Sequence, residues 1–195
     1  MNRAAPQHRY TPEEYVELED NSEFKFEFFD GEVFAMAGST PEHSLISGNL
    51  IRELGNSLAR RGCSVFTSDL RLKVESSGLR THPDVTVLCG PGQYDGTFLL
   101  NPTLIVEVLS KSTEGYDRGD KFDHYRTIPS LHTYLLVSSE SPRVEQYIRK
   151  TTSEWDYRVV HGLDSTVELP ALNITLSLAQ IFLGVAFGPN RLRPN

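Results

Sequence analysis

The N-terminal pattern of hydrophobic and polar residues predicts a short helix followed by a β-hairpin. Thr11 and Glu14 can form a capping box around a proline at the first helical position, which favours a short helix. Two strand-like runs follow, residues 24–29 and 32–37, and the Asp30-Gly31 dipeptide between them is typical of a two-residue hairpin turn.

The middle of the chain predicts a long amphipathic helix, three strands, a second helix and another strand. Apolar residues repeat at helical spacing from Pro41 onward, and Gly62 is expected to end that helix. The other elements are expected over residues 65–74, 83–89 and 103–109 (strands), 117–127 (helix) and 132–138 (strand). Two of these strands are almost entirely apolar, which is typical of strands in the middle of a sheet covered on both faces.

The C-terminal part predicts further strands over residues 143–149, 154–161 and 167–169, a last helix over 176–183, and a loose tail after Gly188. Because the pattern contains no internal repeat or linker, we expect a single domain over residues 1–195. Its parts would be a core at 41–138, an N-terminal helix and hairpin at 11–37, and C-terminal strands and a helix at 143–184.

The composition is that of an ordinary globular protein, since 38% of 195 residues are hydrophobic, enough for one sizeable core. The longest apolar run is shorter than the roughly 20 residues of a membrane span, and the polar N-terminus lacks a signal core. Cys63 and Cys89 are too few for a disulfide framework and lack metal-ligand spacing. We therefore expect a cytoplasmic protein with reduced thiols and no membrane association.

The net charge of −7 argues against a protein that coats nucleic acid nonspecifically. The charge is uneven, however, because residues 43–83 carry six Lys and Arg against three Asp and Glu. Two interpretations stay open for these cations, a solvated surface or a rim that faces phosphates. They are Arg52, Arg60, Arg61, Arg71, Lys73 and Arg80.

The most informative side chain is Glu107, which interrupts the apolar strand predicted at 103–109. A buried carboxylate is costly unless it is protonated, paired or bound to a metal, so either a structural partner or a catalytic role is expected. Asp84 stands at the start of another apolar strand, where it could instead be a turn residue. Together the two carboxylates would form an oxygen-rich site that suits Mg²⁺, with Mn²⁺ as a substitute.

Metal-assisted cleavage of a phosphoester also needs a cation near the attacking water or the developing charge. Lys121 lies on the predicted helix after Glu107 and is the candidate. Taken alone, a lysine in such a charged run is more typical of a solvated surface.

In this order, Pro83-Asp84 and Glu107 resemble the motif of the PD-(D/E)XK nuclease superfamily, and the helix–three strands–helix–strand order resembles its core. The chain is also similar to a restriction endonuclease-like family that is abundant in cyanobacteria. The segments that carry this likeness are residues 26–32, His43, 83–85, 106–110 with 112–113, and 117–125.

The resemblance implies an α/β (α+β) fold with a restriction endonuclease-like αβββαβ core, in which a mixed central sheet is flanked by helices. The superfamily motif has a lysine two positions after its glutamate, where this chain has Leu109. The narrower family is similar in taking that lysine from the following helix, which falls on Lys121. The likeness also draws in Glu27 as a third acid and His43 as a residue that binds a phosphate or orients an acid.

The leading functional prediction is a Mg²⁺-dependent endonuclease that hydrolyses DNA. Asp84 and Glu107 would hold the metal, Lys121 would position the attacking water or help to deprotonate it, and Glu27 and His43 would support them. Two alternatives stay open, a nuclease-fold module that binds DNA or regulates without turnover, and a hydrolase of small phosphate esters. A homodimer is a further expectation, because many nucleases that cut both strands are two-fold symmetric.

Overall fold

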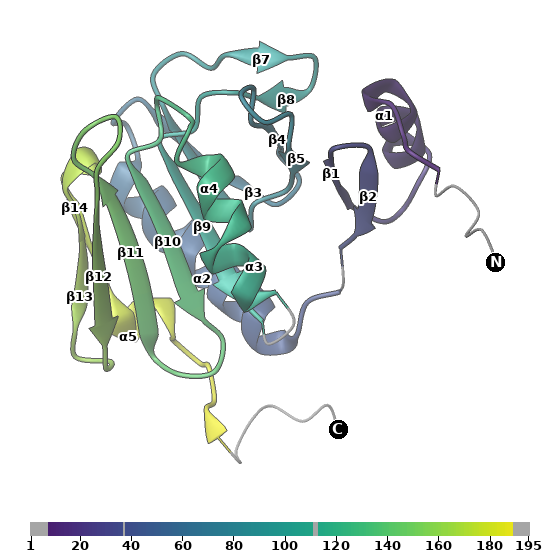
Figure 1. Cartoon of the computed structure of the whole chain (residues 1–195). Helices are drawn as coiled ribbons and strands as arrows, with labels where there is room; N and C mark the ends of the chain where they lie inside the picture. Colours follow the sequence, from purple (N-terminus) through teal and green to yellow (C-terminus); the bar gives the residue numbers. More distant parts are fainter. Residues whose placement is uncertain (1–7, 37, 111–112, 189–195) are drawn as a thin grey trace.

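The computed structural model describes residues 8–36, 38–110 and 113–188 (Figure 1). The helices are α1 (Pro12–Asp20), α2 (Pro41–Leu58), α3 (Glu114–Arg118), α4 (Asp120–Tyr125) and α5 (Leu178–Ile181), with a 3-10 turn at Pro170–Leu172. The strands are β1 (Phe26–Phe29), β2 (Glu32–Ala35), β3 (Cys63–Thr67), β4 (Arg71–Lys73), β5 (Arg80–Thr81), β6 (Val85–Cys89), β7 (Tyr94–Asp95), β8 (Phe98–Leu99), β9 (Leu104–Leu109), β10 (Thr133–Ser138), β11 (Arg143–Arg149), β12 (Trp155–His161), β13 (Thr166–Leu169) and β14 (Ile174–Ser177).

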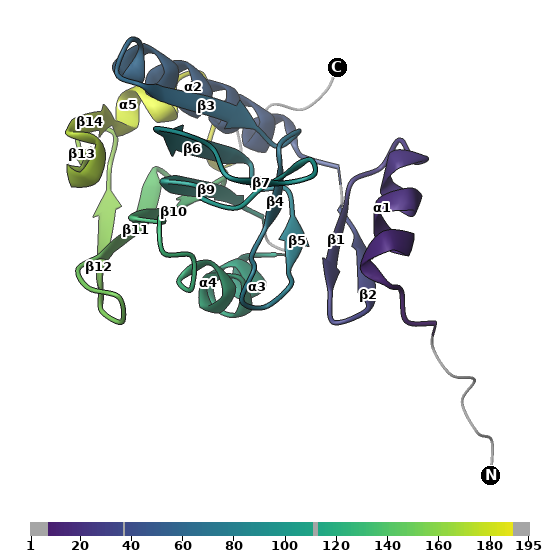
Figure 2. The ribbon, with the colours of Figure 1, turned by 90° about the horizontal axis from the view of Figure 1, so that it is seen from above.

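A mixed six-stranded sheet forms the centre of the molecule, in the order β12-β11-β10-β9-β6-β3. Strands β9 and β10 are parallel, whereas the other neighbours in this sheet are antiparallel. A parallel pair needs a crossover connection, and the segment with α3 and α4 supplies it. Figure 2 shows α2 and α5 on one face of the sheet and α3 and α4 on the other. The expected αβββαβ core with a mixed, helix-covered sheet is therefore confirmed.

Both faces of the central sheet are buried, which explains why its middle strands are apolar at nearly every position. On one face, α2 and the C-terminal elements pack against the sheet through a set that includes Ile46, Leu50, Leu54, Val85, Val106, Val137 and Ile181. On the other face, the segment around α4 packs through Tyr125, Ile128, Leu131, Ile105, Leu109 and Tyr134. Glu107 belongs to this second face by alternation along β9.

A second sheet, in the order β2-β1-β5-β4-β8-β7, carries the N-terminal hairpin against the central body. The hairpin turn is made by Asp30 and Gly31, which both have positive φ, as the Asp-Gly pattern predicts. Helix α1 covers the hairpin through Tyr15, which stacks on Phe28. The opposite face of β1, which carries Glu27, is thereby directed toward the body.

Several predicted elements are divided or shifted in the structure. The run at 65–74 is two strands in different sheets, because a turn from Thr67 to Leu70 separates β3 from β4. Helix α2 ends at Leu58, before Gly62, because Ala59 is already extended. The predicted helix at 117–127 is broken at Gly119, and the one at 176–183 begins as strand β14. The predicted loose tail, residues 189–195, lies outside the described residues.

The expectation of two reduced thiols is wrong. Cys63 on β3 lies directly opposite Cys89 on β6, and the two form a disulfide across the antiparallel pair. Since disulfides are uncommon in reducing compartments, the cysteines no longer argue for a cytoplasmic setting. Within the described ranges, no helix is long and apolar enough to cross a membrane.

A buried carboxylate, Glu19, ties α1 and the hairpin to the rest of the protein. Its oxygens accept hydrogen bonds from Tyr15 Oη (3.0 Å) and the Phe26 N–H (3.2 Å). They also pair with His82 Nε2 (2.7 Å) and Arg71 Nε (2.9 Å). Burial alone would raise the pKa of Glu19, but these partners, His82 foremost, lower it below its usual value.

We expect Glu19→Gln to destabilise the protein by about 1.5–3 kcal/mol at pH 7, because it weakens several hydrogen bonds to a buried charge. Since the folded-state pKa lies below the usual value of 4.5, the carboxylate stabilises the fold above about pH 4.5. That contribution is lost as the pH falls through the folded pKa. In urea unfolding, the difference in free energy of unfolding between the wild type and Glu19→Gln should be smaller at pH 4 than at pH 7. The exposed variant Glu17→Gln should have the stability of the wild type at both pH values.

Candidate active site

Glu107 is buried, with 4% of its surface exposed, and faces α4 from the middle of β9. Its Oε1 accepts a hydrogen bond from Tyr125 Oη (2.9 Å) and lies 3.1 Å from Lys121 Nζ. Burial raises the pKa of Glu107 to about 8, although Lys121 opposes the shift. The partners of this carboxyl group are thus a lysine and a tyrosine.

Asp84 lies beside Glu107 because the antiparallel pairing of β6 and β9 brings Val85 opposite Val106. The Asp84 N–H donates to Glu107 Oε2 (3.4 Å), and Asp84 Oδ2 accepts from the Val108 N–H (2.7 Å). The Asp84 side chain is 16% exposed, so it stands at the mouth of the site rather than in the core. The two carboxylates predicted to hold a metal are therefore neighbours.

Lys121 lies among three carboxylates. Its Nζ is 2.8 Å from Glu27 Oε1, 3.1 Å from Glu107 Oε1 and 3.5 Å from Asp117 Oδ1, and its side chain is 6% exposed. Burial would lower the pKa of Lys121, but the surrounding carboxylates outweigh burial and raise it well above its usual value. Lys121 is therefore a buried ammonium and not a solvated surface lysine.

Glu27 and His43 reach the site from two further elements. Glu27, on β1, faces away from Phe28 and accepts a hydrogen bond from the Thr81 hydroxyl. His43 stands in the first turn of α2, and its Nε2 lies 3.2 Å from Asp84 Oδ2. Burial would lower the pKa of His43, but the bond to Asp84 and the charge of that carboxylate raise it.

Residues that contact this cluster and that sequence reasoning missed include Asp117, Tyr125 and Thr81. Asp117 precedes Lys121 by four residues and Tyr125 follows it by four, so the three share one helix-like face despite the break at Gly119. This spacing of four residues could have predicted that Asp117 and Tyr125 lie beside Lys121. Thr81 was not predictable, because it contacts Glu27 only through the pairing of β5 with β1.

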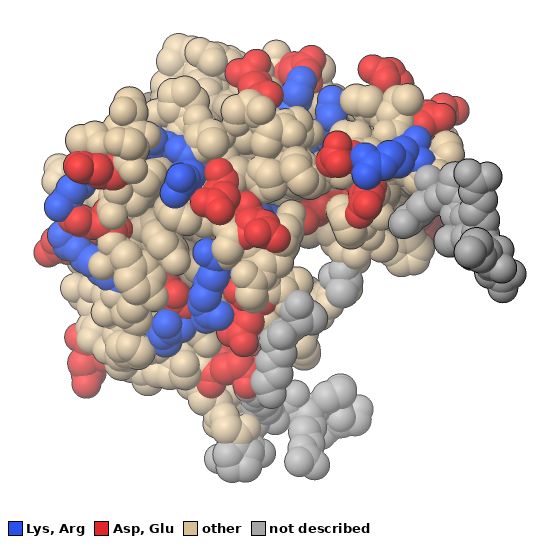
Figure 3. Space-filling view, in the orientation of Figure 1, with Lys and Arg blue, Asp and Glu red and all other residues tan. Residues whose placement is uncertain are grey.

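Three of the six cations in the basic segment at 43–83 are paired with acids in the structure. Arg52 pairs with Glu53 (3.0 Å), Arg71 with Glu19 (2.9 Å) and Lys73 with Asp95 (2.6 Å). Figure 3 shows acidic and basic side chains interspersed over one face of the molecule. Arg60, Arg61 and Arg80 form no ion pair with the described residues, so the pairings support an ordinary charged surface for Arg52, Arg71 and Lys73 alone.

The fold and the residues gathered at its centre define a member of the restriction endonuclease-like PD-(D/E)XK superfamily. Residues 12–180 match the family Uma2, described as "Putative restriction endonuclease", and the chain belongs to this family. Two similar proteins from Synechocystis sp. carry the names "Uncharacterized protein slr1290" and "Uncharacterized protein sll1609". The first is 38% identical over 94% of this chain and 97% of its own length, and the second 34% over 84% and 94%.

A solved structure has the same fold. It is the crystal structure titled a putative nuclease belonging to DUF820 from Anabaena variabilis, which superposes with a TM-score of 0.72. The match covers 87% of this chain and 96% of the other at 19% sequence identity, so it supports the architecture alone.

Proposed function

We propose that this protein is a divalent-metal-dependent endonuclease that hydrolyses DNA phosphodiester bonds. The observation that carries the proposal is the position of Lys121, which is buried and within 3.5 Å of Glu27, Glu107 and Asp117. A buried cation beside several carboxylates is costly to assemble and is typical of sites that handle phosphates and metals. Membership of the family supports the same class of reaction.

The donor atoms suit a hard divalent cation. Asp84 and Glu107 present adjacent carboxylates, and Mg²⁺ or Mn²⁺ prefers such oxygen ligands. In the part of the chain that the structure describes, no three His, Cys, Asp or Glu side chains already form a metal cluster. We assign the ion to Asp84 and Glu107, with water and substrate completing its ligands. When bound, the ion would polarise the phosphate and favour a nucleophilic water.

Lys121 would supply fixed positive charge. Because its pKa is raised, it stays an ammonium and donates hydrogen bonds but does not accept a proton from water. It would therefore position the attacking water and stabilise the charge that develops on the phosphate, and the role of deprotonating water would fall to another group. Glu27 and Asp117 hold the ammonium in place, and His43 orients Asp84 through its Nε2.

The test is a cleavage assay on plasmid and single-stranded DNA with Mg²⁺, Mn²⁺ or EDTA. We expect metal-dependent cleavage that falls at least about a hundredfold in Asp84→Asn, since a ligand to the cation is weakened. Asp164→Asn, an exposed loop variant, should cleave like the wild type. Metal-dependent cleavage that survives Asp84→Asn unchanged contradicts the site.

Two other outcomes of this assay would favour the alternative functions. DNA binding with a steep salt dependence, but no cleavage with either metal, would favour a binding or regulatory module. Turnover of a small aryl phosphate without DNA cleavage would favour a small-ester hydrolase. Light scattering tests the proposed homodimer, which would bring two sites to the two strands of a duplex.

A further inference from the structure

The outer strand of the hairpin, β2, places an exposed aromatic ring beside the candidate active site. In the β1–β2 register Phe34 is directly opposite Glu27, so the two side chains lie on the same face of the hairpin. Glu27 is buried against Lys121, whereas Phe34 is 50% exposed. Single exposed rings are common on protein surfaces, and what sets Phe34 apart is its position directly opposite a residue of the buried ion cluster.

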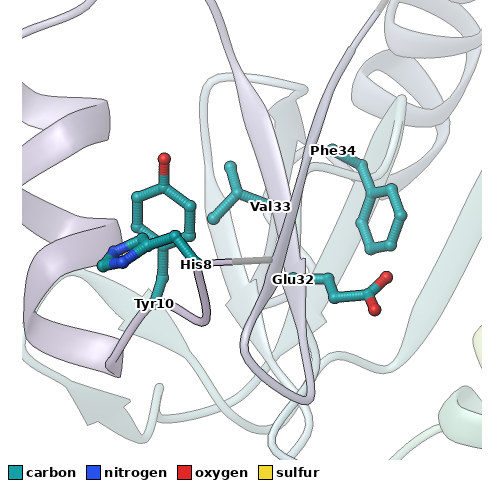
Figure 4. Close-up of a pocket in the computed structure, with 5 residues that line it drawn as sticks. All are labelled: His8, Tyr10, Glu32, Val33 and Phe34. Carbon is teal, nitrogen blue, oxygen red and sulfur yellow. The ribbon is translucent and has the colours of Figure 1, made fainter. Parts of the chain in front are cut away.

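An open hollow of about 400 Å³ follows this edge of the sheet. It is lined by His8, Tyr10, Glu32, Val33 and Phe34, and we refer to it as the β2 hollow. Figure 4 shows Phe34 and Glu32 on one side of the strand and Val33, Tyr10 and His8 on the other.

The charges around the β2 hollow favour a base over a phosphate as its occupant. Within residues 8–36, the cations Arg9 and Lys25 are already paired with Asp30 (3.0 Å) and Asp69 (2.7 Å). The carboxylate of Glu32 lines the hollow and, among the described residues, has no hydrogen-bond or ion-pair partner. A carboxylate repels phosphate but accepts a hydrogen bond from the exocyclic amino group of a nucleobase.

From this geometry we infer that Phe34 and Glu32 form a subsite for one nucleobase of the bound strand, next to the phosphate that is cut. Phe34 stacks on the base, and Glu32 accepts from its amino group, so cytosine or adenine is preferred to thymine. Stacking tolerates any base, and the amino contact adds the preference. The inference rests on the proposed nuclease function and names the part of the substrate that this surface binds.

The experiment measures, by fluorescence anisotropy without metal, the binding of three labelled single-stranded oligonucleotides. One is a dC strand, one is a dT strand, and one is a dC strand with an abasic position. We expect Phe34→Ala to raise the Kd for the dC strand about 5- to 100-fold, the equivalent of one stacked base. Phe34→Trp should restore binding of the dC strand. The abasic strand should bind the wild type and Phe34→Ala with the same Kd. Glu32→Leu, which removes both acceptor oxygens, should remove the preference for dC over dT. Phe24→Ala, at a ring that is 70% exposed outside the hollow, is the matched control.

Cleavage with Mg²⁺, run in parallel, separates this inference from the proposed function. Cleavage by the wild type that is unchanged in Phe34→Ala, together with equal binding, would overturn the subsite and leave the nuclease intact. Binding of dC that depends on Phe34 without any cleavage would overturn the nuclease and leave the base site. If Phe34→Ala instead changes only the oligomeric state in light scattering, the β2 hollow is a contact between copies and the inference is wrong.

Discussion

Replacing Glu107 by glutamine is expected to abolish metal-dependent cleavage while leaving the fold as stable as the wild type, or more stable. Glutamine can still accept from Tyr125 Oη, but it carries no negative charge for a divalent cation. The metal is worth several kcal/mol to the reaction, so cleavage should fall about a thousandfold. Stability responds in the opposite direction, because burial disfavours the ionised Glu107 more than Lys121 favours it, and the amide that replaces it is neutral.

The pH dependence of stability gives this prediction a second readout. The folded-state pKa of Glu107 is about 8, above its usual 4.5, so the folded protein holds a proton that the unfolded chain has released. The wild type should therefore lose stability through this group as the pH rises from about 4.5 to about 8. Glutamine does not titrate, so the advantage of the variant should grow across that window and then level off.

Urea unfolding at pH 5, 7 and 9, with cleavage assays on the same samples, measures both effects. The exposed Glu154→Gln should change neither activity nor the pH dependence. A variant that is inactive but also severely destabilised at pH 9 would contradict the assignment, because Glu107 would then be a structural ion-pair partner and not a strained functional acid.

Local rules predicted the elements that depend on neighbouring residues. The capping box at Thr11 and the Asp30-Gly31 turn appear as expected, since their hydrogen bonds are made within a few residues. The division of residues 65–74 did not follow from the pattern, because β3 and β4 pair with different sheets. The disulfide was missed for the same reason, as Cys63 and Cys89 meet only through the pairing of β3 with β6.

A residue of the candidate site could be predicted from the sequence where a charged residue interrupts an apolar stretch. Glu107 in an apolar strand could be singled out from the chain alone, because a carboxylate there is costly. Glu27 could not, and Lys121 was only a weak candidate, since an acid on a strand and a lysine in a charged run have ordinary surface interpretations, and the resemblance was needed to select them. Their 2.8 Å contact joins segments that are far apart in sequence, and it is created by the packing of the hairpin against α4.

Replacing Lys121 by methionine is expected to be the most destabilising substitution at this site. Methionine preserves the apolar stem but leaves Glu27 and Asp117, beside a largely protonated Glu107, buried without a counter-charge. Removing one partner of a buried ion pair costs about 3–5 kcal/mol, and here one cation contacts three carboxyl groups. The loss of unfolding free energy in Lys121→Met, relative to the wild type, should become smaller as the pH falls toward 4, because the buried carboxylates can then take up protons.

Urea unfolding at pH 7.5 and pH 4.5 tests the expected recovery, and Lys121→Arg separates charge from geometry. The guanidinium keeps the charge but is larger and planar, so we expect it to regain part of the stability and little of the cleavage. Arg126→Met, at a half-exposed cation just after α4, should be near neutral because its pairing with Asp123 is solvent-exposed. If Lys121→Met is as stable as the wild type at pH 7.5, the three carboxylates do not depend on this cation, and it would not be the fixed charge of the site.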